Sequence, residues 1–148
     1  MKRKKLFQRI LLGAAALTFM FFALNSCSKD KDEDEEENTF TIDLSDPAYL
    51  ALKSEGGWVI IPSKQIIVCY TGKVWAGLYG AADSQCTFCG GTLRWEFKPD
   101  VGSSTYFCQG CNSRWGMNCA VVSGPATVAI KDYTAQANGN ILTIHLGK

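Results

Sequence analysis

The sequence predicts an all-β fold of small antiparallel sheets, with a metal-binding subdomain inserted between two sheet regions. Short runs rich in β-branched and aromatic residues recur between turn residues, whereas helical periodicity is scarce. Four of the seven cysteines stand in two C-x-x-C pairs within the insertion, at residues 84–118. Beyond two N-terminal segments, residues 39–148 have the length of one domain.

The first 26 residues predict a lipoprotein signal peptide. Five basic residues among the first nine precede an apolar run at residues 10–24, and the stretch "LNSC" ends at Cys27. This ending resembles the bacterial lipobox, which implies that Cys27 becomes the lipid-bearing first residue and anchors the protein to a membrane. An uncleaved anchor helix is the alternative, although a spanning helix needs about 20 apolar residues.

Residues 27–38 are predicted to form a solvated acidic tether. They hold half of the chain's 14 Asp and Glu residues, which repel one another, and almost no apolar surface that could pack. The run resembles the short acidic signal that directs lipoproteins of Bacteroidota-type Gram-negative bacteria to the outer face of the outer membrane. A plain spacer is the alternative. We therefore expect an outer membrane lipoprotein, at the cell surface or on the periplasmic face.

About eight short strands are expected in residues 39–148. Residue pattern and β propensity single out six runs: residues 39–44, 58–62, 65–70, 74–79, 132–137 and 140–146. Pro47 stops the first strand, and residues 47–53 are the only segment suited to a turn or two of helix. Ser63 and Lys64 fit a tight hairpin. Asn138 and Gly139 fit a type I′ hairpin turn, in which both residues have positive φ.

The charges of the domain argue against one class of partner. Residues 39–148 carry seven acidic and eight basic side chains, so no basic face dominates. Binding to nucleic acid depends on such a face. We therefore expect no nucleic-acid partner.

The spacing of four cysteines predicts a metal site. Cys86 and Cys89 are separated by 18 residues from Cys108 and Cys111, which is the interval of a four-thiolate site. Two cysteines three apart on a tight turn direct both sulfurs to one point. Small or turn-forming residues accompany both pairs and supply backbone freedom: Gly90, Gly91, Gly110 and Asn112.

Each cysteine pair is followed by arginine and tryptophan. Arg94 and Arg114 are placed to offset the net negative charge of four thiolates on a divalent ion, and ordinary solvated charges are the alternative. Trp95 and Trp115 are expected in the core, because aromatic residues of a small β domain are mostly buried.

Oxidation is the rival interpretation of the same sulfurs, because an exported protein meets disulfide-forming conditions. Apart from Cys27, six cysteines remain, and three disulfides would use them all. A metal on the two C-x-x-C pairs leaves Cys69 and Cys119, which either form a disulfide or remain buried thiols.

Residues 40–146 resemble the Rieske-type domains of small bacterial lipoproteins. The resemblance rests on "TIDLSDP", on a Gly pair before a strand, on two ligand boxes, on "VVSGPA" and on the final hairpin. In that family the boxes read C-x-H and C-x-x-H, and two cysteines and two histidines hold a [2Fe–2S] cluster. Cys86 and Cys108 stand at the cysteine positions. The histidine positions fall on Phe88 and Cys111, and the one histidine, His145, lies far along the chain.

The departures from the family pattern change the expected cofactor. Cys89 stands one residue past the first lost histidine, so four short thiolates replace two cysteines and two longer histidines. We expect a rubredoxin-like or zinc-ribbon-like centre with one Fe or Zn on four Cys, in preference to a [2Fe–2S] cluster. The resemblance further implies that Ser113 donates a hydrogen bond to a sulfur and that Pro125 shields the site from water.

Electron transfer is the function that the resemblance implies, with an unknown redox partner. The alternative is a structural module, or a module that binds an unknown ligand at the surface, stabilised by a bound zinc ion. We do not expect an enzyme, because a closed four-cysteine site offers no position for a substrate. Thiol–disulfide exchange is disfavoured because a redox C-x-x-C usually opens a helix, and the surroundings here are β-hairpins.

Overall fold

In the computed structural model, which describes residues 38–72, 78–101 and 104–147, the described strands form two antiparallel sheets. The larger sheet has the spatial order β1-β10-β9-β4-β3-β2, and the smaller one has the order β5-β6-β7-β8. The predicted signal peptide, Cys27 and the acidic tether lie outside the described residues. No helix in the described ranges is long and apolar enough to cross a membrane.

The larger sheet is built from both ends of the domain. Its strands are β1 (Thr39–Asp43), β2 (Trp58–Ile61), β3 (Ile66–Tyr70), β4 (Tyr79–Asp83), β9 (Asp132–Asn138) and β10 (Ile141–His145). A 3-10 helix, η2 (Pro47–Lys53), follows β1, with Pro47 at its first turn and the Asp46 carboxylate accepting from Ala48 N at 2.8 Å. A turn or two of helix was predicted at residues 47–53, and η2 confirms it.

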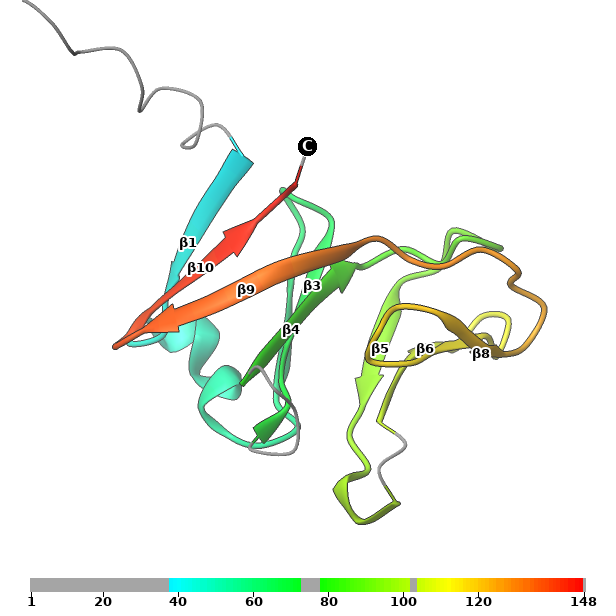
Figure 1. Ribbon diagram of the computed structural model, residues 1–148, viewed down its shortest axis with the longest axis horizontal. Coiled ribbons are helices and arrows are strands. Elements are labelled where there is room, and N and C mark those ends of the chain that lie inside the picture. The colour runs from blue at the N-terminus through cyan, green and yellow to red at the C-terminus, as the bar shows by residue number, and fades with distance from the viewer. Residues whose placement is uncertain (1–37, 73–77, 102–103, 148) are drawn as a thin grey trace, which may run out of the picture. The chain divides into compact units, whose positions relative to one another are not determined.

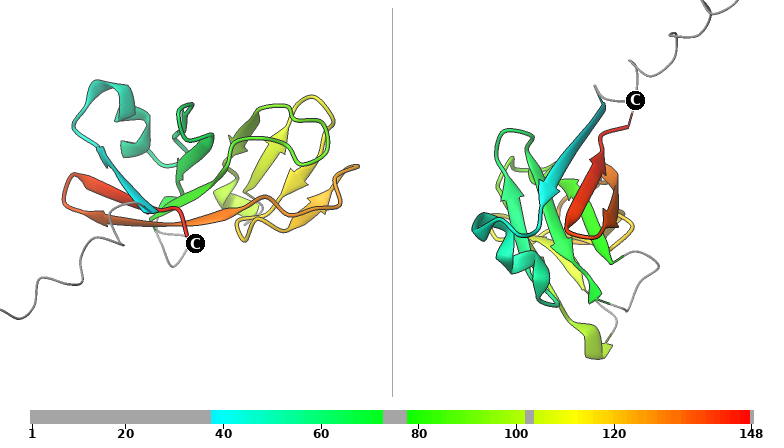
Figure 2. Two further views of the ribbon diagram at one scale, coloured as in Figure 1. Left: turned by 90° about the horizontal axis from the view of Figure 1, so that it is seen from above. Right: turned by 90° about the vertical axis from the view of Figure 1, so that its left-hand side faces the viewer.

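The smaller sheet lies between β4 and β9 in the sequence. Its strands are β5 (Leu93–Glu96), β6 (Thr105–Cys108), β7 (Arg114–Trp115) and β8 (Val121–Ser123), and the short 3-10 helix η4 (Pro99–Val101) joins β5 to β6. Figures 1 and 2 show this sheet as a separate layer, from which the chain returns through β9 into the larger sheet. The predicted all-β fold with an inserted subdomain is therefore confirmed.

Strand β3 is buried on both faces and separates two hydrophobic cores. Ile66 and Val68 point into one core, and Ile67 and Cys69, which alternate with them, point into the other. We call the first the base core. It is made almost entirely of aliphatic side chains: Ile42, Leu44, Leu52, Ile61, Ile66, Val68, Ala81, Leu142 and Ile144.

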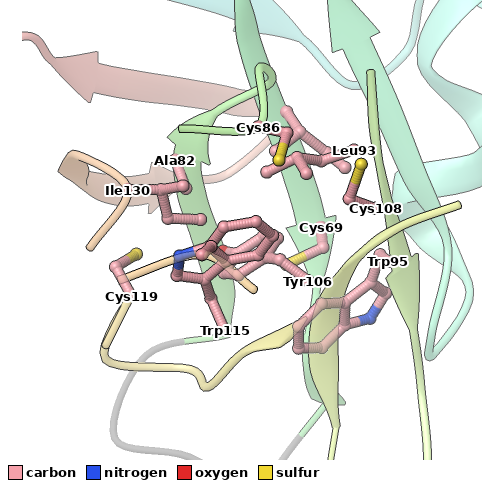
Figure 3. Close-up of a cluster of buried hydrophobic side chains, with 12 residues drawn as sticks. Cys69, Ala82, Cys86, Leu93, Trp95, Tyr106, Cys108, Trp115, Cys119 and Ile130 are labelled. Atoms are coloured by element: carbon pink, nitrogen blue, oxygen red, sulfur yellow. The ribbon is translucent and has the colours of Figure 1, made fainter. Parts of the chain in front are cut away.

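The second core, the site core, joins the two sheets. Its side chains are largely cysteines and aromatic residues: Ile67, Cys69, Ala82, Cys86, Leu93, Trp95, Tyr106, Cys108, Trp115, Cys119, Ala126 and Ile130. Figure 3 shows Cys86 and Cys108 at one end of this core, with Tyr106 and Trp115 packed in its middle. The cysteine segment is thus attached to the larger sheet through its own buried residues.

A β-bulge interrupts the pairing of β7 with β8. Arg114 pairs with Ser123 and the next residue, Trp115, pairs with Val121, so Val122 is an extra residue on β8. Val122 is 60% exposed. The bulge lets Trp115 turn fully inward while β8 ends the sheet.

The strand predicted at residues 74–79 falls mostly on residues 73–77, which lie outside the described ranges, and the next described strand is β4, Tyr79–Asp83. One predicted turn was wrong. The predicted C-terminal hairpin is present, yet Asn138 pairs with Ile141, so the turn consists of Gly139 and Asn140. Only Gly139 has positive φ, at 59°, which is the pattern of a type II′ turn instead of type I′.

Candidate metal centre

The four predicted cysteines come together at the end of the site core. All four Sγ atoms of Cys86, Cys89, Cys108 and Cys111 lie within 4.8 Å of one another. Two close contacts cross between the pairs: Cys86 Sγ is 3.5 Å from Cys111 Sγ, and Cys89 Sγ is 3.4 Å from Cys108 Sγ. Cys86 and Cys108 are buried, Cys111 is half-buried and Cys89 is exposed.

The two C-x-x-C turns have the same backbone hydrogen bonds. In the first, Cys86 N donates to Gly91 O at 2.8 Å and Gly90 N donates to Cys86 O at 2.9 Å. In the second, Cys108 N donates to Ser113 O and Asn112 N donates to Cys108 O, at 2.9 and 2.8 Å. The turns are therefore two copies of one knuckle facing each other, and we refer to them as the first and second knuckle.

One position in each knuckle requires a left-handed backbone. Gly90 has a φ of 71° and Asn112, four residues after its cysteine in the same way, has a φ of 61°. Asparagine tolerates this region better than other side chains, so the two residue types are equivalent here. Gly91 and Gly110 were expected to supply the same freedom, but neither has a positive φ.

Polar hydrogens surround the sulfurs unequally. Cys86 Sγ accepts from Phe88 N at 3.4 Å and from Cys89 N at 3.5 Å. Ser113 Oγ lies 3.1 Å from Cys111 Sγ and also accepts from Ala126 N at 3.0 Å. Once Cys111 is a thiolate, the Ser113 hydroxyl can donate to it, so the arrangement agrees with the role expected of Ser113.

The surroundings push the pKa values of two thiols in opposite directions. The Ser113 hydroxyl beside its sulfur lowers the pKa of Cys111 to about 6. Burial raises the pKa of Cys108 to about 12. A cation that binds both sulfurs must displace the proton that burial favours on Cys108, whereas the surroundings of Cys111 favour its thiolate.

A loop from β8 to β9 covers the second knuckle. Gly124 has a φ of 94°, and a Cβ at this position would lie 2.5 Å from Ser113 Cα, so the loop packs directly on the knuckle backbone. The Val128 carbonyl accepts from Thr87 Oγ1 at 2.8 Å and from Trp115 Nε1 at 3.0 Å. These bonds fix the loop to both knuckles. Pro125, which was expected to shield the site, belongs to this loop and is exposed.

The two arginines lie on the smaller sheet. Arg114 forms an ion pair with Glu96, donates to Thr105 Oγ1 at 3.2 Å and lies over the Phe107 ring, 4.2 Å from its centroid. Its charge is therefore directed to Glu96. The same ion pair lowers the pKa of Glu96. Arg94 is exposed on β5. The role in balancing thiolate charge remains a prediction for both.

The other cysteines lie in the site core. Cys69 and Cys119 are buried free thiols, which is one of the two alternatives left open by the sequence. Cys69 Sγ lies 3.7 Å from the Tyr106 hydroxyl and 3.6 Å from Gly80 O. His145 is in β10, paired with Thr39 and Thr134, and is not one of the residues that surround the four sulfurs.

The sequence did not predict the roles of Thr87 and of the Val128 carbonyl. A backbone carbonyl leaves no mark on composition, and a single threonine inside C-x-x-C has many ordinary roles. Trp115 was expected in the core, where it is fully buried, but its bond to the covering loop depends on long-range geometry.

Comparisons with known proteins give a likeness to solved structures alone. No protein-family model matches the sequence, and no curated protein matches it either. Among solved structures, the plasma membrane Rieske protein PetC3 of the cyanobacterium Synechocystis PCC 6803 is similar, with 23% sequence identity and a TM-score of 0.49. The match covers 66% of this chain and 93% of that one.

The donor set fits a single tetrahedral metal ion. A metal–sulfur bond of about 2.3 Å in a tetrahedron places neighbouring sulfurs about 3.8 Å apart. The two sulfur contacts across the pairs measure 3.4 and 3.5 Å, and all four sulfurs lie within 4.8 Å, so the tetrahedral spacing falls inside the observed range. Cysteine sulfurs in this geometry select zinc or iron among the common ions.

Proposed function

We propose that this protein is a membrane-anchored, Rieske-like metal-binding lipoprotein that transfers electrons through one iron ion on Cys86, Cys89, Cys108 and Cys111. The observation that carries the proposal is the convergence of four sulfurs within 4.8 Å, presented by two knuckles with the same hydrogen bonds. The membrane anchor is a lipid on Cys27, proposed from the sequence.

The sulfur geometry favours one ion over two. In a [2Fe–2S] cluster each iron takes two protein ligands, and a rhomb of two irons and two sulfides separates the two ligand pairs. Here each buried sulfur lies close to a sulfur of the opposite knuckle, so no pair is held apart from the other. A single ion at the common centre is therefore the better fit.

Features of the centre support electron transfer. Cys89 is exposed while Cys86 and Cys108 lie in the site core, so one ligand reaches the surface and the others are protected. Iron on four thiolates supplies a one-electron couple when bound. Amide donors to Cys86 and the Ser113 hydroxyl beside Cys111 would stabilise the more negative, reduced form. Since no histidine surrounds the sulfurs, the couple should not be linked to a ligand proton.

A zinc-stapled module that binds a surface ligand is the second candidate. The observation in its favour is that Cys86 and Cys108 are part of the site core, so any ion would fasten both knuckles to the rest of the domain. Zinc has no redox chemistry, and a closed four-cysteine site is the arrangement of structural zinc.

Metal analysis and an absorption spectrum test the proposal. The full-length chain is purified in detergent without oxygen. One iron per chain with visible thiolate charge-transfer bands and a reversible couple supports electron transfer. One zinc and no colour supports the stapled module and contradicts electron transfer. A chain without metal and without free thiols contradicts both. Two irons with two acid-labile sulfides would contradict the single-ion centre.

Mass spectrometry of the mature chain tests the anchor. Diacyl or triacyl modification of Cys27 and loss of residues 1–26 are expected. An intact N-terminus would contradict the lipid anchor without affecting the metal proposal.

A further inference from the structure

The four sulfurs differ in their surroundings, and Cys108 Sγ has the amides of Gly110 and Cys111 beside it as Cys86 Sγ has those of Phe88 and Cys89. Cys86 Sγ accepts hydrogen bonds from two amides, and Cys111 Sγ lies beside the Ser113 hydroxyl. Ser113 and Thr87 also form hydrogen bonds with the loop that covers this side. For Cys89 Sγ, the hydrogen bonds among described residues give one neighbour, Cys108 Sγ at 3.4 Å. Cys89 is also the exposed member of the four.

Two glycines flank the Cys89–Cys108 pair. A Cβ on Gly91 would lie 3.3 Å from both sulfurs of this pair. A Cβ on Gly110 would lie 3.6 Å from Cys89 Sγ and 3.8 Å from Cys108 Sγ. Neither glycine has a positive φ, so the backbone does not require glycine at either position. Their lack of a side chain leaves Cys89 Sγ, the exposed sulfur of the pair, without a covering side chain from either glycine, while Cys108 stays buried.

The equivalent positions of the knuckles make the asymmetry clear. Gly91 occupies in the first knuckle the place of Ser113 in the second, because Cys86 N and Cys108 N donate to their carbonyls in the same way. Ser113 places a hydroxyl on Cys111, whereas Gly91 places nothing on Cys89 or Cys108. Cys111 thus has a hydroxyl against its sulfur, whereas the exposed Cys89 has no side chain against it from the equivalent position.

We propose that the Cys89–Cys108 pair is an oxidation site, at which a peroxide joins the two knuckles by a disulfide and opens the metal centre. This rests on the proposed metal-binding function. The Cys89 thiolate attacks hydrogen peroxide, so that a sulfur–oxygen bond forms, the O–O bond breaks and hydroxide leaves. The Cys108 thiolate then attacks the sulfenic sulfur of Cys89 and expels a second hydroxide. The two thiolates lose two electrons, and the peroxide gains them.

The product is a disulfide across the knuckles instead of one within a C-x-x-C turn. Each turn is closed by its own backbone hydrogen bonds, and Cys89, the exposed cysteine, has its 3.4 Å sulfur contact with Cys108 of the opposite knuckle. With two of its four thiolates joined, the chain keeps only Cys86 and Cys111 as ligands and releases the ion. The site therefore reports peroxide by losing its metal.

The experiment uses the full-length chain loaded with zinc, because zinc contributes no electrons of its own. Zinc content is measured first. Hydrogen peroxide is then added at increasing ratios, zinc release is followed with a colorimetric chelator, and disulfides are mapped by mass spectrometry. We expect the Cys89–Cys108 disulfide to form first and zinc release to follow it with the same rate. Thioredoxin or dithiothreitol with added zinc should restore the centre.

Gly110→Ala provides the decisive variant. The new Cβ meets both sulfurs at ordinary contact distance, so it should leave zinc content unchanged and slow zinc release severalfold. Gln109→Ala, on an exposed neighbour in the same knuckle, is the matched control and should react like the unmodified chain.

Several results would overturn the inference. A first disulfide at Cys86–Cys89, Cys108–Cys111 or Cys86–Cys111, zinc release with no disulfide, or a Gly110→Ala chain that reacts at the normal rate would each do so. A chain that takes up no zinc would contradict the metal proposal instead. The same mapping on the reduced, metal-free chain would then still test whether Cys89 and Cys108 pair first.

Discussion

The two faces of β3 lead into cores of different chemistry. On one face Ile66 and Val68 join an all-apolar base core, with Leu142 and Ile144 from β10 fully buried against them. On the other face Ile67 and Cys69 meet the site core, in which cysteines and aromatic rings replace most aliphatic chains. Within the described residues, the site core also leaves the buried Trp95 Nε1 without a hydrogen-bond partner.

This difference indicates two sources of stability. The base core gains from burial of aliphatic surface, at about 25 cal/mol per Å². The site core has fewer such groups, and an unpaired buried N–H costs about 1–3 kcal/mol. We therefore expect packing alone to keep the larger sheet folded, whereas the smaller sheet should need an ion bound by the two knuckles to stay folded.

Removing the metal ligands should give the largest effect. The double variant Cys86→Ser, Cys108→Ser loses one sulfur from each knuckle and should bind no metal. Structural zinc contributes about 10–16 kcal/mol in zinc-finger peptides, so the apparent free energy of unfolding should fall by several kcal/mol. Denaturant unfolding and metal content measure this. Cys69→Ala is the control that keeps the metal. Unchanged unfolding and metal content in the double variant would remove the basis of the metal centre.

A cavity in the base core should act independently of the metal. Leu142→Ala removes a fully buried side chain, which typically costs about 2–5 kcal/mol. The metal content of the folded fraction should stay at the level of the unmodified chain, because Leu142 belongs to the base core, whereas Cys86 and Cys108 belong to the site core. Loss of metal at temperatures where this variant is still folded would show that the two cores are not separate.

Alkaline pH should weaken the site core selectively. Burial raises the pKa of Cys69 and of Cys119 from 9.0 to about 12. The unfolded chain therefore loses these protons first, and stability that is fully present below pH 9 is lost as pH rises towards 12. Each thiol should contribute a slope of about 1.4 kcal/mol per pH unit in that window.

Urea unfolding between pH 8.5 and 9.5 tests the onset of this loss, where each unfolded-state thiol is about half ionised and the slope is about half of its full value. The window lies below the range in which tyrosines titrate. A Cys69→Ala, Cys119→Ala chain should show a clearly smaller decrease than the unmodified chain with the same metal content. An equal decrease in both would mean that these thiols are not responsible.

The smallest effect is expected at the hydroxyl beside Cys111. Ser113→Ala removes one partner of Cys111 Sγ and the acceptor for Ala126 N, at a cost of about 0.5–1.5 kcal/mol. In the iron-loaded chain the reduction potential should also fall, because the more negative reduced form loses a donor. Ser113→Thr, which keeps the hydroxyl, should restore much of both. A potential that is unchanged by Ser113→Ala would show that the hydroxyl does not act on the sulfur.

Local patterns in the sequence predicted the parts of the site that depend on local geometry. Two C-x-x-C turns at this interval can place four sulfurs together because each turn sets its own sulfurs, and the structure has them within 4.8 Å. The pairing of Arg114 with Glu96 was not predicted, since it depends on which strands neighbour each other. The same limit applies to the covering loop, whose contacts join residues 41 positions apart at Thr87 and Val128.

The fold was predictable for similar reasons. Strands with β-branched residues, such as β2 and β3, were found close to their true bounds. β4 was not predicted because its sequence, YGAAD, contains glycine, alanine and aspartate, which disfavour strands on their own. In the structure it pairs with β3 and β9, and its Ala81 and Ala82 are fully buried, one in each core.

The extra residue at Val122 also affects how the protein behaves at high local concentration. β8 is the outer strand of its sheet, and a regular outer strand can recruit a strand from another molecule. The bulge breaks the even spacing of amide and carbonyl groups along this border, so an incoming strand could not stay in register. Crowded copies should therefore pair poorly through the β8 edge of the metal-bearing sheet.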